Sequence, residues 1–133
     1  MNTHLETEAH RLYDKGAMII GVNRKVSVGD WGGKDFSVQT NRPKWEEVKQ
    51  SLRHPKVTGI AIVLGPISGD LYCRDWDEVG AYEQWASEHP DLAAVLPTAR
   101  TKRGYHNYFT SDKVLPTNTY NDGELRGAGS YVG

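Results

Sequence analysis

The sequence of 133 residues contains a single cysteine, Cys73, and no long apolar run. One cysteine cannot form a disulfide within the chain and provides no metal-binding cysteine spacing, which favours a reducing compartment. No apolar stretch approaches the roughly 20 residues that a membrane-spanning helix requires. The first residues, which include His4, Glu6 and Glu8, are not typical of a signal peptide. These absences predict a soluble protein of the cytoplasm.

The chain also lacks an excess of charge of either sign. Sixteen Lys and Arg residues are balanced by seventeen Asp and Glu residues, for a net charge of -1. Any contact with nucleic acid must therefore be local. Hydrophobic residues make up 38% of the chain, with four Trp and seven Tyr, and this apolar surface can offset the entropy lost on folding. The length predicts one domain over residues 1–133.

The first half of the chain combines two predicted helices with one buried strand. A helix with a capping-box start is expected over residues 3–15, and a second, with a proline in its first turn, over residues 43–53. Residues 17–22 between them predict an apolar strand. Residues 23–41 are polar and have no regular period, which predicts a long loop, and loops of that length often carry function.

The second half is predicted to hold short strands around one further helix. The expected elements are, in order, a strand over residues 59–64, a turn over 65–69, a strand over 70–75, a helix with Val79, Tyr82, Trp85 and Ala86 inward that Pro90 closes, strands over 99–102 and 105–109, a polar turn over 117–123 and a strand over 124–132. The first two strands are expected to form a hairpin. The alternation predicts an α+β fold, with helices on one face of a mainly antiparallel sheet.

Two acidic residues, Asp75 and Asp77, are the sharpest local feature. On a strand, the two-residue period places both side chains on one face. Two neighbouring carboxylates repel each other unless a cation neutralises them, and Mg²⁺ prefers such oxygen ligands. The alternative is a strand end followed by a helix N-cap, where acidic residues are also favourable. The pair is therefore a candidate metal site, with this alternative open.

His106 follows two basic residues, Lys102 and Arg103, across a glycine. On a strand, His106 and Tyr108 share one face. A histidine beside basic residues on a glycine-loosened backbone is suited to holding a triphosphate, and the alternative is a surface or packing histidine.

A third acidic segment spans Asp122 to Gly127. Glu124 and Arg126 share a strand face there, and a third carboxylate would complete a site for two divalent ions. The alternative is a turn with a solvent-facing ion pair.

The order and spacing of these segments resemble the N-terminal domain of bifunctional primase-polymerases, in the archaeo-eukaryotic primase superfamily. The matching pieces are, in order, a Gly-Pro-x-Ser-Gly turn at 65–69, the acid-x-acid pair Asp75 and Asp77, Leu96-Pro97-Thr98, residues 101–106 with Tyr108-Phe109, Gly123-Glu124-Leu125-Arg126-Gly127 and Gly129-Ser130-Tyr131-Val132. The resemblance covers roughly the second half of the chain. It implies a catalytic core like an RNA-recognition-motif (RRM) sheet, with an added α/β layer from the N-terminal half.

The resemblance implies a role for each acidic residue. Asp75 and Asp77 would be the first ligands of two Mg²⁺ or Mn²⁺ ions, and Glu124 would be the third carboxylate. Asp122 stays open as the third acid, because the wider superfamily commonly has Asp where this chain has Glu. His106 would contact the incoming nucleotide.

Basic residues complete the implied site. Lys102, Arg103 and Arg126 are expected to contact the nucleotide. Lys34 and Trp31 lie in the glycine-bearing loop and are candidates for contact with nucleotide or template, since aromatic rings can stack on bases.

The implied function is template-directed nucleotidyl transfer, that is, DNA primase and DNA polymerase activity. The expected partners are a single-stranded or primed DNA template, nucleoside or deoxynucleoside triphosphates, and a helicase or other replication domain. Family members usually continue past the position of Val132 through a proline-rich segment, so we expect a domain short at its C-terminus. A catalytically weak or inactive replication module that binds nucleotide or nucleic acid stays open.

A different enzyme class also fits the first acidic pair. Residues 75–79 resemble the D-x-D-x-[TV] opening of haloacid-dehalogenase-like phosphatases, in which the first Asp attacks phosphate. That interpretation requires a more hydrophobic preceding strand and a later acid pair for magnesium, and it leaves His106 and Glu124 unexplained.

Overall fold

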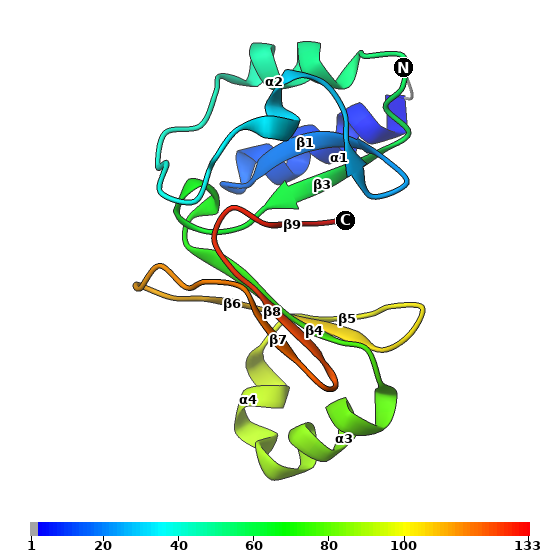
Figure 1. The fold of residues 1–133 in the computed structure, drawn as a ribbon, viewed down its shortest axis with the longest axis vertical. Helices are drawn as coiled ribbons and strands as arrows, with labels where there is room; N and C mark the ends of the chain where they lie inside the picture. Colours follow the sequence, from blue (N-terminus) through cyan, green and yellow to red (C-terminus); the bar gives the residue numbers. More distant parts are fainter. Residues whose placement is uncertain (1–2) are drawn as a thin grey trace.

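The computed structural model describes residues 3–133 and contains two antiparallel sheets, each packed against helices (Figure 1). Its elements are, in chain order, α1 (Thr3–Asp14), β1 (Met18–Asn23), β2 (Val26–Ser27), the 3-10 helix η1 (Asp30–Gly33), α2 (Trp45–Leu52), β3 (Gly59–Val63), the 3-10 helix η2 (Pro66–Ser68), β4 (Leu71–Trp76), α3 (Val79–Glu88), α4 (Pro90–Val95), β5 (Thr98–Arg100), β6 (Tyr105–Thr110), β7 (Asn118–Tyr120), β8 (Gly123–Arg126) and β9 (Tyr131–Val132). The predicted α+β class with antiparallel pairing is confirmed. Within the described residues, no helix has both the length and the apolar character needed to cross a membrane.

The N-terminal lobe is built on a four-stranded sheet with the order β2-β1-β3-β9. Met18, Ile19 and Ile20 of β1 are all buried, as an inner strand with both faces covered requires. Helices α1 and α2 pack against β1 and bury Ala9 and Leu52 on their apolar faces. This lobe therefore contains most of the hydrophobic core.

The C-terminal lobe is a five-stranded sheet with the order β5-β6-β4-β8-β7, and β4 is its central strand. The side chains of β4 alternate between two environments. Trp76 contacts the rings of Tyr82 and Trp85 on α3, so this face of the sheet is covered by helices. Asp75 points the other way, into a cleft between the two sheets. The N-terminal sheet lies on the side of the C-terminal sheet that faces away from α3 and α4 (Figure 1).

The predicted hairpin of residues 59–64 with 70–75 is wrong. β3 pairs with β1 and β9, β4 pairs with β6 and β8, and only an isolated bridge joins Gly65 to Leu71. β3 is apolar and fits the helix-covered N-terminal sheet, whereas β4 alternates polar and apolar residues. The turn at residues 65–69 therefore carries the chain from one sheet to the other.

Four boundaries also differ from the sequence-based prediction. The loop predicted over residues 23–41 contains β2 and η1, and the turn predicted over 117–123 contains β7. The strand predicted over 124–132 is two strands, β8 and β9, which lie in different sheets. Pro90 does not only close α3 but also begins α4, since proline fits the first turn of a helix. Short strands with few residues carry too little pattern to be recognised.

Candidate active site

Three of the residues selected from the sequence lie in one row across the C-terminal sheet. Asp75 on β4 is the direct partner of His106 on β6 and of Glu124 on β8. Residues directly opposite on antiparallel strands have side chains on the same face, with Cβ atoms about 5 Å apart. The register therefore brings together residues that are 49 positions apart in the sequence, from Asp75 to Glu124.

Asp75 and His106 of this row line the cleft between the sheets, which has a volume of about 430 Å³, whereas Glu124 is not among its lining residues. The lining includes Asp75, His106 and Arg126 from the C-terminal sheet and Val22 and Ala61 from the N-terminal sheet. A polar wall therefore meets an apolar one. Such a cleft can exclude water from part of a bound ligand while presenting charged groups to another part.

The carboxylate of Asp75 has partners at both oxygens. Its Oδ1 lies 3.2 Å from Nε2 of His106, and its Oδ2 lies 3.1 Å from Nη2 of Arg126. The Nε of Arg126 lies 3.3 Å from Oε1 of Glu124. Asp75 is only 8% exposed, so these charge-assisted contacts compensate for its loss of water. One guanidinium thus bridges the two carboxylates.

Asp77 reaches the same cleft by a different route from the one predicted. β4 ends at Trp76, so the strand period does not place Asp77. Its backbone N–H donates to the carbonyl of Asp122 at 2.8 Å, and its exposed side chain lines the cleft together with that of Asp75. The two acids therefore share a cavity, although only Asp75 is held by a strand.

Two glycines allow the neighbouring strands to approach the end of β4. A Cβ atom at Gly123 would lie 1.9 Å from the carbonyl oxygen of Asp75, and one at Gly104 would lie 1.9 Å from that of Trp76. Gly123 also has a φ of 141°, which side-chain-bearing residues rarely adopt. The close packing of β6 and β8 on β4 thus depends on residues without side chains.

The structure separates the two candidates for the third acid. Asp122 accepts a hydrogen bond of 2.5 Å from Arg74, whose guanidinium lies over the Trp76 ring on the helix-covered face. Glu124 lies on the cleft face, in register with Asp75. Glu124, not Asp122, is therefore the acid that shares a face with Asp75.

Some of the predicted basic residues lie at the cleft and others do not. Lys102 and Arg103, on the turn between β5 and β6, line the cleft with Arg126. Lys34 is exposed and is not among the residues that line the cleft. Trp31 packs against the N-terminal core and lines a different pocket beside α2. The geometry thus brings the glycine-bearing loop to another part of the N-terminal lobe.

The cleft lining also contains residues that were not selected from the sequence, among them Lys25 and Tyr131. Lys25, at the tip of the β1–β2 hairpin, lines the cleft opposite His106, and the hydroxyl of Tyr131 donates to its carbonyl at 2.9 Å. A two-residue turn joins Asn23 to Val26, but its sequence Arg-Lys is not a usual one, since two-residue hairpins favour Asn-Gly. The hairpin was therefore interpreted as loop.

Burial shifts the pKa values of two side chains on the cleft face, His106 and Tyr108. Loss of solvent is the main cause that lowers the pKa of His106, assisted by the nearby charges of Arg126 and Lys25, although Asp75 acts in the opposite direction. Burial also raises the pKa of Tyr108, whose hydroxyl lies 3.4 Å from Nδ1 of His106, to about 12. At neutral pH the imidazole is therefore neutral, and it can donate a hydrogen bond to Asp75 or accept one from a ligand.

The lowered pKa of His106 predicts a loss of stability in mild acid. The ordinary value is 6.5, so below this pH the unfolded chain takes up a proton that the folded protein takes up only at lower pH. We expect the free energy of unfolding of the wild type to fall as pH drops from neutral through the folded pKa, and to fall less in His106→Gln. Urea titrations across this pH range measure both slopes. Parallel slopes would contradict the prediction.

The donor set of the cleft fits a hard divalent cation. Asp75, Asp77 and Glu124 offer only carboxylate oxygens, which Mg²⁺ and Mn²⁺ prefer. Among residues 3–133, no group of three or more His, Cys, Asp or Glu side chains is already arranged around a metal position. The guanidinium of Arg126 instead lies between Asp75 and Glu124. A cation shared by these two acids thus requires Arg126 to turn away.

Comparison with known proteins does not assign the chain to a family. No protein-family model matches it, and no curated protein matches it significantly.

Proposed function

We propose that the chain is a metal-dependent nucleotidyl transferase of the primase-polymerase type, which extends or begins a DNA strand on a template. The observation that carries the proposal is the row of His106, Asp75 and Glu124 on three adjacent strands, of which His106 and Asp75 line the cleft and Glu124 is in register with Asp75. The resemblance assigned roles to these residues from their order in the sequence alone. Their convergence on one face supports those roles, because unrelated surface residues have no reason to share a register.

The arrangement of the lobes is compatible with the architecture that the resemblance implies. The five-stranded sheet has helices α3 and α4 on one face (Figure 1), and the side chains of the candidate site lie on the other. We infer that this sheet is the RRM-like catalytic core and that the N-terminal sheet, with α1 and α2, is the added α/β layer. The substrate would then lie between the two sheets.

Each residue of the cleft has a proposed task. Asp75, Asp77 and Glu124 hold Mg²⁺ or Mn²⁺, which would lower the pKa of the attacking hydroxyl and offset the charge of the leaving pyrophosphate. His106, neutral and held by Asp75 through Nε2, contacts the incoming nucleotide as a hydrogen-bond acceptor. Arg126, once released from the carboxylates, pairs with phosphate oxygens.

The remaining parts of the proposal concern the partners. Lys102 and Arg103 contact the triphosphate at the mouth of the cleft, where both side chains are exposed. Base pairing with a single-stranded or primed DNA template selects the nucleotide, so the protein needs only backbone contacts. A helicase or another replication domain is the proposed partner protein.

The direct test is primer extension. The protein is incubated with Mn²⁺, deoxynucleoside triphosphates and a labelled primer annealed to a template, and the products are separated by length. Template-dependent extension supports the proposal. Binding of template and nucleotide by wild-type protein without extension supports the second candidate function below.

The position of Arg126 between Asp75 and Glu124 predicts how strongly Mn²⁺ stabilises the protein. In Arg126→Gln the two acids lose their bridging cation, so we expect a lower stability without metal and half-maximal stabilisation at an Mn²⁺ concentration about tenfold lower than in the wild type. Thermal unfolding over an Mn²⁺ titration measures this. Arg53→Gln, which removes an arginine that lies 3.6 Å from Glu6 in the N-terminal lobe, is the control. Equal Mn²⁺ responses in Arg126→Gln and the wild type would contradict the prediction.

The second candidate function is binding of nucleotide or nucleic acid without catalysis. The bridging guanidinium of Arg126 favours it, since that group already neutralises Asp75 and Glu124. A replication module of this kind would bind the triphosphate at the basic mouth of the cleft.

A further inference from the structure

The tip of the β1–β2 hairpin has an unusual backbone. Asn23 pairs with Val26, which leaves Arg24 and Lys25 as a two-residue turn, and both have positive φ angles, of 49° and 69°. This is the pattern of a type I′ turn, in which Asn and Gly are favoured and long side chains are strained. Two basic residues therefore lie at a position where local stability alone selects against them.

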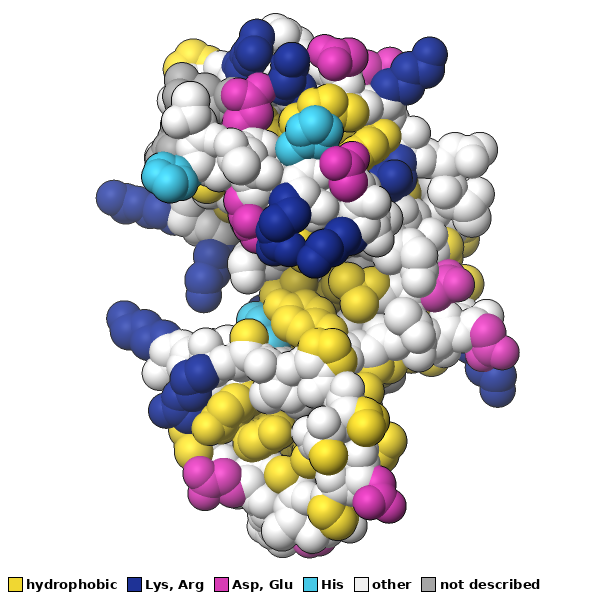
Figure 2. Space-filling view, turned by 180° about the vertical axis from the view of Figure 1, so that it is seen from behind, with side chains coloured by type: hydrophobic (Ala, Val, Ile, Leu, Met, Phe, Trp, Pro, Cys, Tyr) yellow, Lys and Arg dark blue, Asp and Glu magenta, His cyan; other side chains and the backbone are white. Residues whose placement is uncertain are grey.

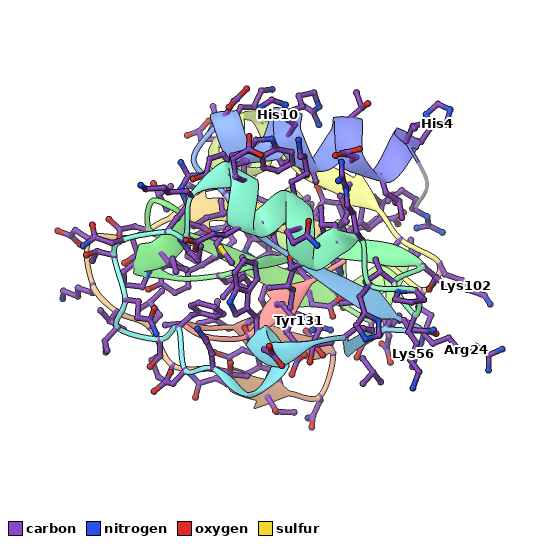
Figure 3. All side chains as sticks on the ribbon, turned by 90° about the horizontal axis from the view of Figure 1, so that it is seen from above. His4, His10, Arg24, Lys56, Lys102 and Tyr131 are labelled. Atoms are coloured by element: carbon purple, nitrogen blue, oxygen red, sulfur yellow. The ribbon has the colours of Figure 1, made fainter. Side chains whose placement is uncertain are left out.

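The hairpin tip lies at one edge of the cleft. Lys25 lines the cleft, and the side-chain amide of Asn23 donates to the carbonyl of Lys56 at 2.8 Å, so the loop before β3 adjoins the tip. Figure 3 shows Arg24, Lys56 and Lys102 projecting from the same side of the molecule. The N-terminal lobe thus contributes three basic residues to this edge.

The opposite edge of the cleft is basic as well. Lys102 and Arg103 extend from the β5–β6 turn of the C-terminal lobe. Figure 2 shows Lys and Arg side chains projecting from both lobes beside the gap between them. The basic rim is defined here by five exposed residues, Arg24, Lys25, Lys56, Lys102 and Arg103. Among residues 3–133, no carboxylate forms an ion pair with any of them.

We propose that the N-terminal part of the basic rim, Arg24, Lys25 and Lys56, binds the phosphate backbone of single-stranded nucleic acid, beside the triphosphate proposed for Lys102 and Arg103, and that the Arg24-Lys25 turn is its main contact. This inference rests on the proposed function and deepens it, since it assigns the surface that holds the template strand. The net charge of the chain is only -1, so an unpaired group of five cations is a local attraction for a polyanion. Cations on both sides of the cleft suit a strand held at one edge and a triphosphate at the other, while the acids stay on the cleft wall.

The strained turn provides a sharp test. Arg24→Asn combined with Lys25→Gly removes both charges and installs the favoured type I′ sequence, so thermal stability is expected to equal or exceed that of the wild type. Affinity is measured by fluorescence anisotropy with a labelled oligothymidylate of about 20 nucleotides, over a range of salt and without divalent metal. Lys15→Gln combined with Lys113→Gln removes the same charge from exposed positions outside the rim and the cleft lining.

We expect the turn variant to bind the oligothymidylate about tenfold more weakly. The slope of log affinity against log salt should shrink by about 1.4, since each lost contact to a single strand contributes roughly 0.7. The control should bind within about twofold of the wild type. Unchanged affinity and slope in the turn variant, or no binding by the wild type, would overturn the inference.

Two further arms separate this inference from its alternatives. Binding of deoxythymidine triphosphate is measured in parallel, and loss of triphosphate binding with unchanged oligothymidylate binding would assign the turn to the nucleotide and overturn the proposal. Asp75→Asn is expected to bind the oligothymidylate like the wild type. If the turn variant binds the oligothymidylate more weakly but the wild type extends no primer, the proposed enzyme activity is contradicted and the nucleic-acid-binding role of the rim is not. If the wild type extends primers but binding does not depend on the rim, the role of the rim is contradicted and the enzyme activity is not.

Discussion

Asp75→Asn is expected to lower the rate of primer extension by about a thousandfold. Asp75 is the central residue of the row, and its two oxygens contact His106 and Arg126. The amide keeps the size of the side chain but removes the negative charge that a divalent ion requires. The measurement is single-turnover extension of a labelled primer with saturating Mn²⁺ and deoxynucleotides, so that the rate reports chemistry and not affinity.

The control for this prediction is Glu78→Gln, which removes one charge three positions along the chain. Glu78 is exposed, is not among the cleft-lining residues, and makes no side-chain cap hydrogen bond at the start of α3. Its extension rate should stay within about twofold of the wild type. Glu124→Gln should resemble Asp75→Asn, and Asp122→Asn should resemble Glu78→Gln. A wild-type rate in Asp75→Asn would remove the carboxylate row from the mechanism.

Thermal unfolding of the same variants tests whether a lower extension rate reflects unfolding of the protein and not a change in the active site. Asp75 is buried against Arg126, so Asp75→Asn is expected to lose about 2 kcal/mol of stability, because the guanidinium loses one of its two carboxylate partners and keeps only Glu124. That loss leaves the protein folded at assay temperature only if the wild type is more stable than this amount, and circular dichroism measures whether it is. The extension rate is then compared between folded populations.

The sequence predicted which side chains share a face because strand alternation is local. His106 with Tyr108, and Glu124 with Arg126, lie on common faces as expected. The main helices and β1 were also predicted, since their apolar residues follow a clear period. These features depend only on neighbours in the chain.

Pairing between distant strands could not be predicted in the same way. The apolar run of β3 and the mixed run of β4 are separated by one turn, which is the usual signal for a hairpin, yet the two strands belong to different sheets. The choice between Asp122 and Glu124 depended on which of them is in register with Asp75, and register is a tertiary property. The Arg24-Lys25 turn was missed because its residues contradict the local preference.

The second large effect concerns folding: Gly104→Ala is expected to destabilise the protein by about 3 kcal/mol. The new Cβ atom would lie 1.9 Å from the carbonyl oxygen of Trp76, and a backbone atom cannot move aside as the end of a side chain can. The start of β6 must therefore separate from the end of β4. For a domain of this size the thermal midpoint should fall by roughly 10 °C.

Gly80→Ala is the matched control, because Gly80 lies in α3 with no atom within 4 Å of the new Cβ position. Alanine is favoured over glycine in a helix, so this variant should gain roughly 0.5 kcal/mol. The displaced turn in Gly104→Ala carries Lys102 and Arg103, so nucleotide affinity should fall together with stability. Equal thermal midpoints for the two variants would show that β6 does not approach β4 this closely, and the register that joins His106 to Asp75 would then be in doubt.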